Sequence, residues 1–389
     1  MEEILLKDIC DLDNGYAFRS DDYVESSDTL NCRMSNIRPD GTFDILYSAK
    51  YLPDEFSEKY EDYLLNDGDL IIAMTDMAGD PKILGVPTVV DTKGYKLLLN
   101  QRVGKLRFIK PGVNADYLKL ALQSKRVREY LKRFAGGGVQ LNVSKKDILN
   151  APVRMRTEEE QNYIAVLFRR VLEIKKKREQ ELLCLDNLIK ARFVEMFGNI
   201  KEEQLLEDIS EFVTVGIANS ATHAYAESGI PMLRNQNIKE NYLDDTDLIY
   251  IKPEFAAKYE SKKLKENDII AMRTGYPGIA CLVPKKYEGC QTFTTLIVRL
   301  KAENNPSYVC SYINSDLGKR FIESGKVGVA QQNFGAKSLA KMPIKIAPKE
   351  LQDEYADFVK QVDKSKVVVQ KALDEAQLLF DSLMQEYFG

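Results

Sequence analysis

The chain has 389 residues, of which 44% are hydrophobic and 29% are charged, as is typical of a globular protein with two or three domains. It has no apolar run of 18 residues and its N-terminus is acidic, so we expect neither a membrane span nor a signal peptide. The six cysteines form no CxxC pair and His223 is the single histidine, which argues against a zinc site, a disulfide framework or a histidine-based active site. We therefore expect a cytoplasmic protein with reduced thiols.

Charge is distributed unevenly along the chain, although the net charge is only −4. Residues 1–80 carry a net charge of −14 and residues 81–156 carry +13, and the polarity repeats at −6 in residues 199–268 and +7 in residues 269–348. The two basic segments could present positive faces to nucleic acid. Alternatively, each could neutralise the acidic segment beside it, and charge alone leaves both possibilities open.

The first predicted domain, residues 1–156, is a series of short strands and loops. Its motifs in chain order are CRMSNI (Cys32 to Ile37), GDLIIAM (Gly68 to Met74), TDMAGDPKILG (Thr75 to Gly85), LLLNQRVGKLRF (Leu97 to Phe108), a helix (Asp116 to Phe134) and a Gly-rich turn with Gln-x-Asn (Gly136 to Asn142). An apolar stretch after a turn predicts a buried strand, and a loop that follows such a strand has a rigid base suited to binding.

Residues 157–198 are predicted to form one long helix. Thr157 and Glu160 form a capping box at its start, and no proline or glycine occurs between Pro152 and Gly198. Apolar residues recur at three- and four-residue steps, a pattern that favours a coiled-coil seam. About 40 helical residues would extend roughly 60 Å, so this helix needs a partner to bury its apolar stripe.

The second half of the chain repeats the first. The second predicted domain, residues 199–348, carries the motifs in the same order, and a second helix, residues 349–389, overlays the first without a gap at a shift of 191 positions. We therefore predict an α+β fold: two α+β domains in tandem, each followed by a long helix, with the two helices paired as an antiparallel coiled coil. The alternative is that each helix packs on its own domain as an ordinary amphipathic helix.

Motifs of known enzymes are absent from the sequence. It has no P-loop, GxGxxG, HExxH or GxSxG. Asn305-Pro306-Ser307-Tyr308 differs at one position from the [Asp/Asn/Ser]-Pro-Pro-aromatic motif of amino-methyltransferases. Pro306 is instead typical of the first turn of a helix. We predict no catalytic residue, no metal ligand and no cofactor bound by this chain.

Polar and basic residues on the predicted loops are the candidates for contacts with double-stranded DNA. Amide side chains can donate to and accept from base edges, and Arg and Lys neutralise phosphates. The predicted DNA-binding residues are Arg33, Asn36, Thr75, Asp76, Arg102, Arg126, Gln140, Asn142, Lys145 and Lys146 in the first domain, and Arg234, Gln236, Arg273, Thr274, Tyr276, Gln331, Gln332, Asn333 and Lys337 in the second. Each could also be a solvated polar residue or part of a turn.

The order domain–helix–domain–helix, with LDNLIKARFVEMFG (Leu185 to Gly198), GDLIIAMTDMAG (Gly68 to Gly79) and Glu160-Gln161 after Pro152, resembles the specificity subunit of Type I restriction-modification systems over the whole chain. The resemblance implies that each domain recognises one half of an asymmetric bipartite DNA sequence. It also implies that the helices set the spacing and dock two methyltransferase subunits, which bind S-adenosylmethionine, and that restriction and translocase subunits can join this complex. The residues predicted to dock these partners are Phe193, Met196, Phe197, Tyr387 and Phe388.

Two other classes of function are compatible with the sequence. A self-contained adenine methyltransferase or nuclease would need a cofactor loop, and binding of S-adenosylmethionine by the purified chain would support it. A scaffold whose two domains bind proteins would not bind duplex DNA when the modification partner is present.

Overall fold

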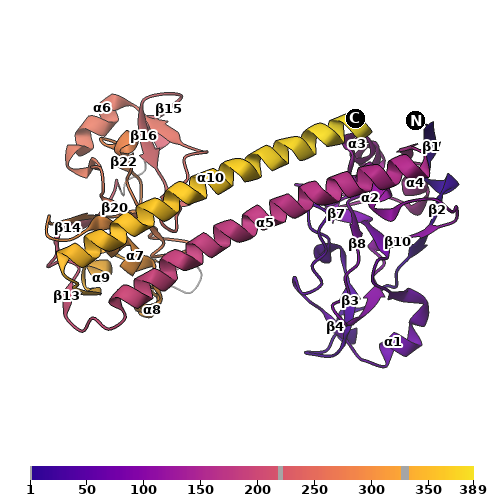
Figure 1. Cartoon of the computed structure of the whole chain (residues 1–389), viewed down its shortest axis with the longest axis horizontal. Helices are drawn as coiled ribbons and strands as arrows, with labels where there is room; N and C mark the ends of the chain where they lie inside the picture. Colours follow the sequence, from indigo (N-terminus) through magenta and orange to yellow (C-terminus); the bar gives the residue numbers. More distant parts are fainter. Residues whose placement is uncertain (1, 218–221, 326–332) are drawn as a thin grey trace. The chain divides into compact units, whose positions relative to one another are not determined.

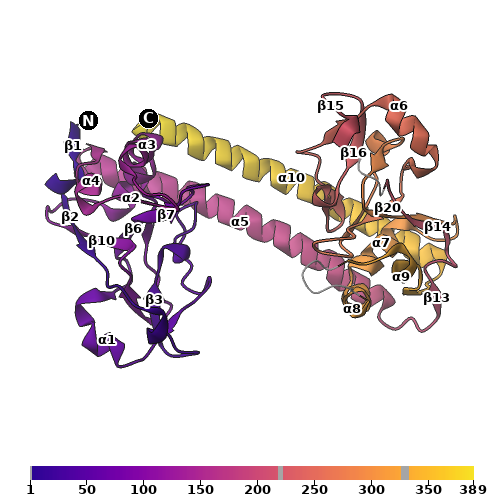
Figure 2. The same cartoon turned by 180° about the vertical axis from the view of Figure 1, so that it is seen from behind.

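A computed structural model of the chain describes residues 2–217, 222–325 and 333–389. It divides into two compact units, Met1–Arg178 with Ala372–Gly389, and Glu179–Lys371. Each unit combines one globular domain with one half of each long helix, α5 (Glu158–Phe197) and α10 (Lys349–Phe388), as can be followed in Figures 1 and 2. Within the described residues, no helix is long and apolar enough to cross a membrane.

Short strands and helices make up the globular domain of the first unit. They are β1 (Glu2–Leu5), β2 (Cys10–Asn14), β3 (Thr29–Cys32), β4 (Tyr51–Leu52), α1 (Phe56–Lys59), β5 (Leu64–Leu65), β6 (Leu70–Ala73), β7 (Thr75–Met77), β8 (Pro87–Val89), β9 (Lys96–Leu99), β10 (Val103–Phe108), α2 (Ala115–Gln123), α3 (Lys125–Phe134), β11 (Gln140–Asn142), α4 (Lys145–Leu149) and β12 (Pro152–Met155). An antiparallel sheet has the order β2-β10-β6-β8, and a second sheet has the order β4-β3-β9-β5 with β3 and β9 parallel. Two-stranded pairs β1–β12 and β7–β11 complete the domain.

The globular domain of the second unit has the same plan. Its elements are β13 (Glu203–Leu205), β14 (Ser210–Val215), β15 (Tyr225–Ala226), β16 (Ile230–Leu233), β17 (Ile238–Lys239), β18 (Tyr242–Leu243), β19 (Ile249–Ile251), α6 (Pro253–Ala256), β20 (Ile269–Ala271), β21 (Ala280–Leu282), β22 (Gln291–Thr292), β23 (Leu296–Leu300), α7 (Pro306–Asn314), α8 (Asp316–Ser324), α9 (Ala336–Ala340) and β24 (Pro343–Lys345). The sheet β14-β23-β20-β21 matches β2-β10-β6-β8, and β13–β24 matches β1–β12. The sheet topology thus confirms the tandem duplication.

Two elements expected from the sequence are divided in the structure. The apolar run from Leu97 to Phe108 is split between β9 and β10, which belong to different sheets, because the Asn100 side chain accepts a hydrogen bond from the Arg102 N–H at 3.2 Å and turns the chain. The expected helix from Asp116 to Phe134 is split into α2 and α3 because Ser124 caps a new helix by accepting from the Val127 N–H. Ser315 divides α7 from α8 in the same way.

The two long helices run antiparallel within each unit. In the first unit the start of α5 packs against the end of α10, and the rings of Phe168 and Phe380 meet edge to face with centroids 5.3 Å apart. In the second unit the end of α5 packs against the start of α10, where Arg192 forms an ion pair with Glu354 at 3.0 Å. The predicted antiparallel pair is confirmed, and each end of the pair also packs on a globular domain.

Matching hydrogen bonds attach each domain to the long helix that follows it. The backbone N–H of Asn114 donates to the Gln161 side chain at 3.0 Å, and the N–H of Asn305 donates to Gln352 at 2.8 Å. Gln161 and Gln352 are 3% and 1% exposed, and each also donates to a main-chain carbonyl. Asn114 and Asn305 are 191 positions apart, as are Gln161 and Gln352, so the two domains are joined to their helices by equivalent residues.

The motif Asn305-Pro306-Ser307-Tyr308 belongs to this junction. The Asn305 side chain caps α7 by accepting from the Ser307 N–H, and Pro306 occupies the first turn. The fully buried Tyr308 donates its hydroxyl to the Lys345 carbonyl at 2.7 Å, as Tyr117 donates to Arg154 in the first unit. Every member of the motif thus has a structural role at the start of a helix.

We expect Phe388→Ala to destabilise the first unit by about 3–5 kcal/mol, the usual cost of removing a buried aromatic side chain. Phe388 is 2% exposed and lies among the core residues Ile164, Phe168 and Leu383, with its ring centroid 5.2 Å from that of Tyr117. Urea denaturation measures the change. The matched control is Leu379→Ala on the same helix, because Leu379 is 49% exposed and should change stability by about 0.5 kcal/mol or less. Equal effects of the two substitutions would contradict the packing described.

Candidate DNA interface

Residues far apart in the sequence meet at the end of β6 in the first unit. The strand continues into β7, which pairs with β11 so that Thr75 lies opposite Asn142 and Met77 lies opposite Gln140. The Thr75 hydroxyl donates to the Asn142 side chain at 2.7 Å. The Arg102 carbonyl accepts from the Met74 N–H at 2.9 Å, which places Arg102 beside this pair. The structure therefore brings together four predicted DNA-binding residues, Thr75, Arg102, Gln140 and Asn142. Thr75 is only 2% exposed, so it joins the two segments, and its position does not support a direct contact with DNA.

Asp76 holds the adjoining loop in place. Its carboxylate is 5% exposed and accepts hydrogen bonds from the backbone N–H groups of Met77, Ile83 and Leu84. Both carboxylate oxygens of Asp76 therefore already accept hydrogen bonds from the domain's own backbone. The predicted DNA contact of Asp76 thus gains no support from its position, which instead fixes the shape of residues 77–84.

The second unit has a corresponding pair of segments after β20. Thr274 forms a bridge with Asn333, as Thr75 pairs with Asn142 in the first unit. Asn235 donates to the Thr274 hydroxyl at 2.8 Å and accepts from the Arg273 N–H at 3.2 Å. Arg273, Thr274 and Asn333, three of the predicted DNA-binding residues, thus lie together, whereas Gln331 and Gln332 lie outside the described residues.

The two loops start and end at equivalent anchors but differ in length. Gly85 and Gly278 both have positive φ, and a Cβ on either would come within 2.4 Å of Leu131 or 2.2 Å of the equivalent Ile322. Between Thr75 and Gly85 there are nine residues, whereas between Thr274 and Gly278 there are three. The pairs of Thr75 with Asn142 and of Thr274 with Asn333, together with the glycines Gly85 and Gly278, thus form the same frame in both units. This frame carries two loops of different length and chemistry.

Four residues predicted to contact DNA form hydrogen bonds within their own domains: Arg33, Asn36, Arg234 and Gln236. Asn36 is 1% exposed, accepts from the Arg33 N–H and donates to three main-chain carbonyls, so its amide closes a loop. Arg234 donates to the Asp247 carboxylate at 2.9 Å, and Gln236 donates to the same group at 2.7 Å. The Arg33 guanidinium donates to the Ser48 carbonyl at 3.1 Å. None of these positions supports a direct base contact.

The predicted phosphate-binding residues fall into two groups. Arg126 forms an ion pair with Glu3, and Lys145 forms one with Asp11 at 2.9 Å, whose carboxyl pKa is lowered chiefly by that hydrogen bond. The side chains of Arg102 and Lys146 in the first unit and of Lys337 and Tyr276 in the second are exposed. Arg126 and Lys145 are already held in ion pairs, so the exposed residues are better placed for contact with DNA phosphates.

Sequence reasoning missed an exposed pair of cations at the end of α3. Lys132 and Arg133 are exposed and immediately precede the Gly-rich turn that leads into β11. The sequence pattern marks them only as part of a helix, although their position beside three glycines is a signal that could have identified them. Arg102 and Lys146 are likewise exposed, and they lie on segments that adjoin the β7–β11 pair in the chain or by a backbone hydrogen bond.

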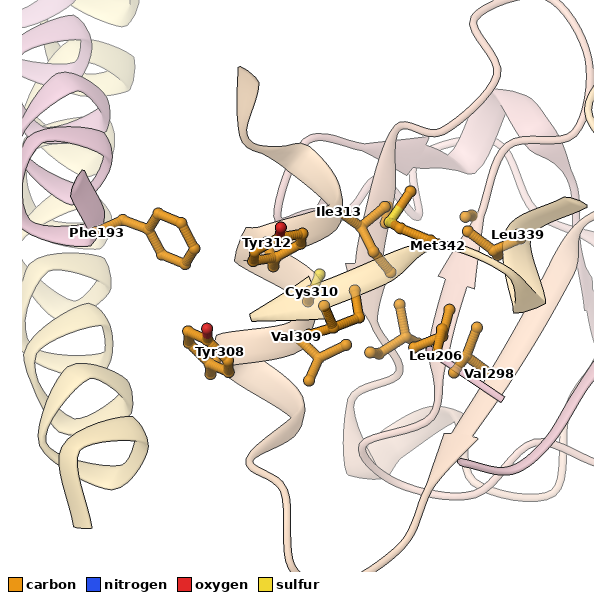
Figure 3. Close-up of a cluster of buried hydrophobic side chains, with 14 of the residues drawn as sticks. Phe193, Leu206, Val298, Tyr308, Val309, Cys310, Tyr312, Ile313, Leu339 and Met342 are labelled. Carbon is orange, nitrogen blue, oxygen red and sulfur yellow. The ribbon is translucent and has the colours of Figure 1, made fainter. Parts of the chain in front are cut away.

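The predicted docking residues mostly lie in the chain's own core. Phe193 and Phe197 are 7% and 1% exposed, and Figure 3 shows Phe193 pointing from α5 toward Tyr308 and Tyr312 of α7. The Phe193 and Tyr308 rings stack with centroids 5.7 Å apart. Phe388, which corresponds to Phe197 at the shift of 191 positions, is buried in the first unit, and Met196 and Tyr387 are half-buried. Helical periodicity identified the apolar face correctly but could not show that α2 and α7 cover it.

The buried cysteines are chemically inert. Burial raises the pKa of the Cys10, Cys32 and Cys281 thiols to about 12, which keeps them protonated and unreactive. Across residues 2–217, 222–325 and 333–389, histidines, cysteines and carboxylates form no group that could hold a metal ion.

Comparison with known proteins identifies the class to which this fold and these paired loops belong. The model of the "Type I restriction modification DNA specificity domain" matches residues 1–183 and again residues 201–376. The chain therefore belongs to the Type I restriction-modification DNA specificity family and contains two copies of its domain, as the resemblance in sequence predicted.

Individual relatives are distant in sequence. The Type I restriction enzyme MjaVIII specificity subunit of Methanocaldococcus jannaschii is 24% identical over 187 residues, which are 46% of this chain and 42% of that protein, so the match spans less than half of the relative. The crystal structure of a Type I restriction-modification S subunit from M. genitalium has a TM-score of 0.56 at 13% identity, covering 100% of this chain and 96% of the other. A chain from a study of complex assembly and conformational transition of the type I R-M system has a TM-score of 0.58 at 14% identity, covering 100% and 97%. At these identities the solved structures show the fold.

Proposed function

We propose that this chain is the DNA-recognising subunit of a Type I restriction-modification complex and has no catalytic site of its own. Each globular domain recognises one half of an asymmetric bipartite target, and the long helices set the distance between the halves. Two methyltransferase subunits, which bind S-adenosylmethionine, dock on the chain, and restriction and translocase subunits can join them.

The observation that carries the proposal is the pair of unlike loops on one repeated frame. Thr75 with Asn142, and Thr274 with Asn333, form the same base in both units, and Gly85 and Gly278 close it in the same way. A frame that is kept while its exposed loop differs suits two domains with one task and two different targets. Exposed amides and cations at the loops provide base-edge and phosphate contacts.

The equivalent leucines Leu188 on α5 and Leu379 on α10 are better candidates for docking than the buried aromatics. They are 47% and 49% exposed and are related by the shift of 191 positions. Each lies in a different compact unit, so a pair of identical subunits could use the same kind of contact twice. This arrangement supports two methyltransferase subunits for each recognition subunit.

Mapping of methylated sites tests the proposal. The chain is co-expressed with the methyltransferase subunit of its own system in a host that lacks other modification, and methylated bases are mapped across the genome. We expect methylation at one asymmetric sequence of two specified halves separated by unspecified bases. A palindromic site, or methyl transfer or cleavage by the purified chain alone, would contradict the proposal.

Replacing Lys132, Arg133 and Lys146 together by alanine should weaken binding to all duplex sequences and flatten its salt dependence. For each phosphate that the protein no longer neutralises, the slope of log K against log salt should decrease in magnitude by roughly 0.9. Fluorescence anisotropy of the assembled complex at several salt concentrations measures the slope for target and non-target DNA. Lys59→Ala, at an exposed residue over the Phe56 ring, is the control and should leave the slope unchanged. Altered sequence preference at an unchanged slope would reverse the roles assigned here.

A further inference from the structure

The two most exposed large hydrophobic side chains among the described residues both lie at the candidate DNA interfaces. Val139 is 78% exposed at the Gly-rich turn of the first unit, and Tyr276 is 74% exposed on the loop of the second. Single exposed apolar residues are common on protein surfaces. Val139, however, lies at the turn before β11, and Tyr276 lies on the loop between Thr274 and Gly278. Each is therefore positioned to contact whatever binds at the candidate DNA interface of its unit.

In the first unit the apolar side chains belong to a two-stranded ribbon. Met77 is 49% exposed and lies directly opposite Gln140 in the β7–β11 pair. Val139 precedes Gln140, and its carbonyl accepts from the Ala78 N–H at 3.1 Å, so the pairing extends to the end of the ribbon. Met77 shares the ribbon face of Gln140, because directly paired residues of an antiparallel ladder face the same side. Val139 comes one residue before β11, at the exposed end of the ribbon where the strand gives way to the Gly-rich turn.

The surroundings of the ribbon fit DNA as the occupant. The exposed cations Lys132, Arg133, Lys146 and Arg102 lie on the segments that lead into and support it. Gly136 and Gly138 have open space around them, so the chain beside Val139 carries no side chain that would hinder close approach. A two-stranded ribbon fits the major groove, where glutamine pairs with adenine and apolar side chains contact the thymine methyl group.

We propose that Val139 and Met77 contact the 5-methyl groups of thymines in the major groove of the first half-site. The inference rests on the proposed function and adds to it the chemical group that these side chains recognise. Gln140 then pairs with an adenine between or beside those contacts. The second unit carries Tyr276 at the position that corresponds to Met77, so the proposed methyl contacts of Val139 and Met77 concern the first half-site alone.

Deoxyuridine in place of thymidine removes only the methyl group and therefore tests the proposal directly. Once the target is mapped, each thymine on both strands is replaced in turn, and the affinity of the complete complex with its methyltransferase subunits and S-adenosylmethionine is measured. We expect the wild-type affinity to fall about fourfold at one or two positions of the first half-site. This is the change expected when binding no longer removes one methyl group from water. Val139→Ala or Met77→Ala should abolish the effect at one of these positions.

The controls separate this inference from the proposed function. Val24→Ala, at a 40% exposed valine elsewhere in the first unit, should keep the wild-type response, and no variant should change the response of the second half-site. A complex that selects its target yet ignores deoxyuridine throughout the first half-site overturns the inference alone. So does a first half-site without thymine, or a deoxyuridine effect that both alanine variants retain. Failure of the complex to distinguish target from other duplexes overturns the proposed function as well.

Discussion

Inserting four residues into both long helices, after Lys176 in α5 and after Val367 in α10, is expected to lengthen the unspecified spacer of the target by one or two base pairs. The two positions are equivalent at the shift of 191 and lie near the middle of each helix. Four helical residues add about 6 Å, and duplex DNA advances about 3.4 Å per base pair. Four residues also exceed one turn by only about 40°, so the apolar stripe nearly keeps its direction.

Methylation-site mapping reads the spacer length and both half-sites in a single experiment. A two-residue insertion at the same positions is the control, because it rotates the two ends of each helix by about 200° relative to each other and should abolish assembly. The half-sites should be unchanged in the four-residue variant. An active four-residue variant with its original spacer would show that the helices do not set the distance.

Exchanging residues 1–156 for the recognition domain of another specificity subunit is expected to replace one half-site completely and leave the other unchanged. The domain is attached to α5 through the Asn114 N–H, which donates to Gln161, and to α10 through Tyr117, which packs against Phe388. The Asn114 side chain also donates to Asn162 and caps α2 by accepting from the Tyr117 N–H, so the incoming domain must carry asparagine and tyrosine at these two positions. Mapping of methylated sites again provides the measurement.

A chain rebuilt with its own domain at the same junctions is the matched control and should keep the original target. A second chimera with alanine at position 117 tests the attachment, because the loss of that ring should impair assembly while any remaining methylation keeps the new half-site. If the exchange altered both half-sites, the two domains would not read DNA independently.

The architecture could be predicted from the sequence because the chain provides its own comparison. Phe197 and Phe388 match at a shift of 191, and the capping box from Thr157 to Glu160 marks where α5 begins. The strand pairings could not be predicted, because β3 pairs in parallel with β9, more than 60 positions later, and no local pattern records such a contact. The serine caps that restart α3 and α8 were visible, but the apolar periodicity running across them suggested continuous helices.

The location of the candidate site could be predicted better than its individual residues. Thr75 and Asn142 belong to separate predicted loops, and the structure joins them by a hydrogen bond. Asn36 and Asp76 look equally polar in the sequence, but main-chain groups satisfy both of them inside the domain. Periodicity assigned Phe193 and Phe388 to an apolar face without showing what covers that face. Polar type and spacing therefore indicate where a site lies, whereas burial decides which side chains are available.

The first unit draws its final segment, Ala372–Gly389, from the end of the chain. Tyr117 and Phe168 therefore lack the covering side chains of Leu383 and Phe388 until residues 372–389 have been synthesised. The second unit, by contrast, is formed from one continuous stretch of sequence, Glu179–Lys371. The first unit is thus completed only after the second unit has been synthesised, and losing the last turn of α10 would open the core of the first unit.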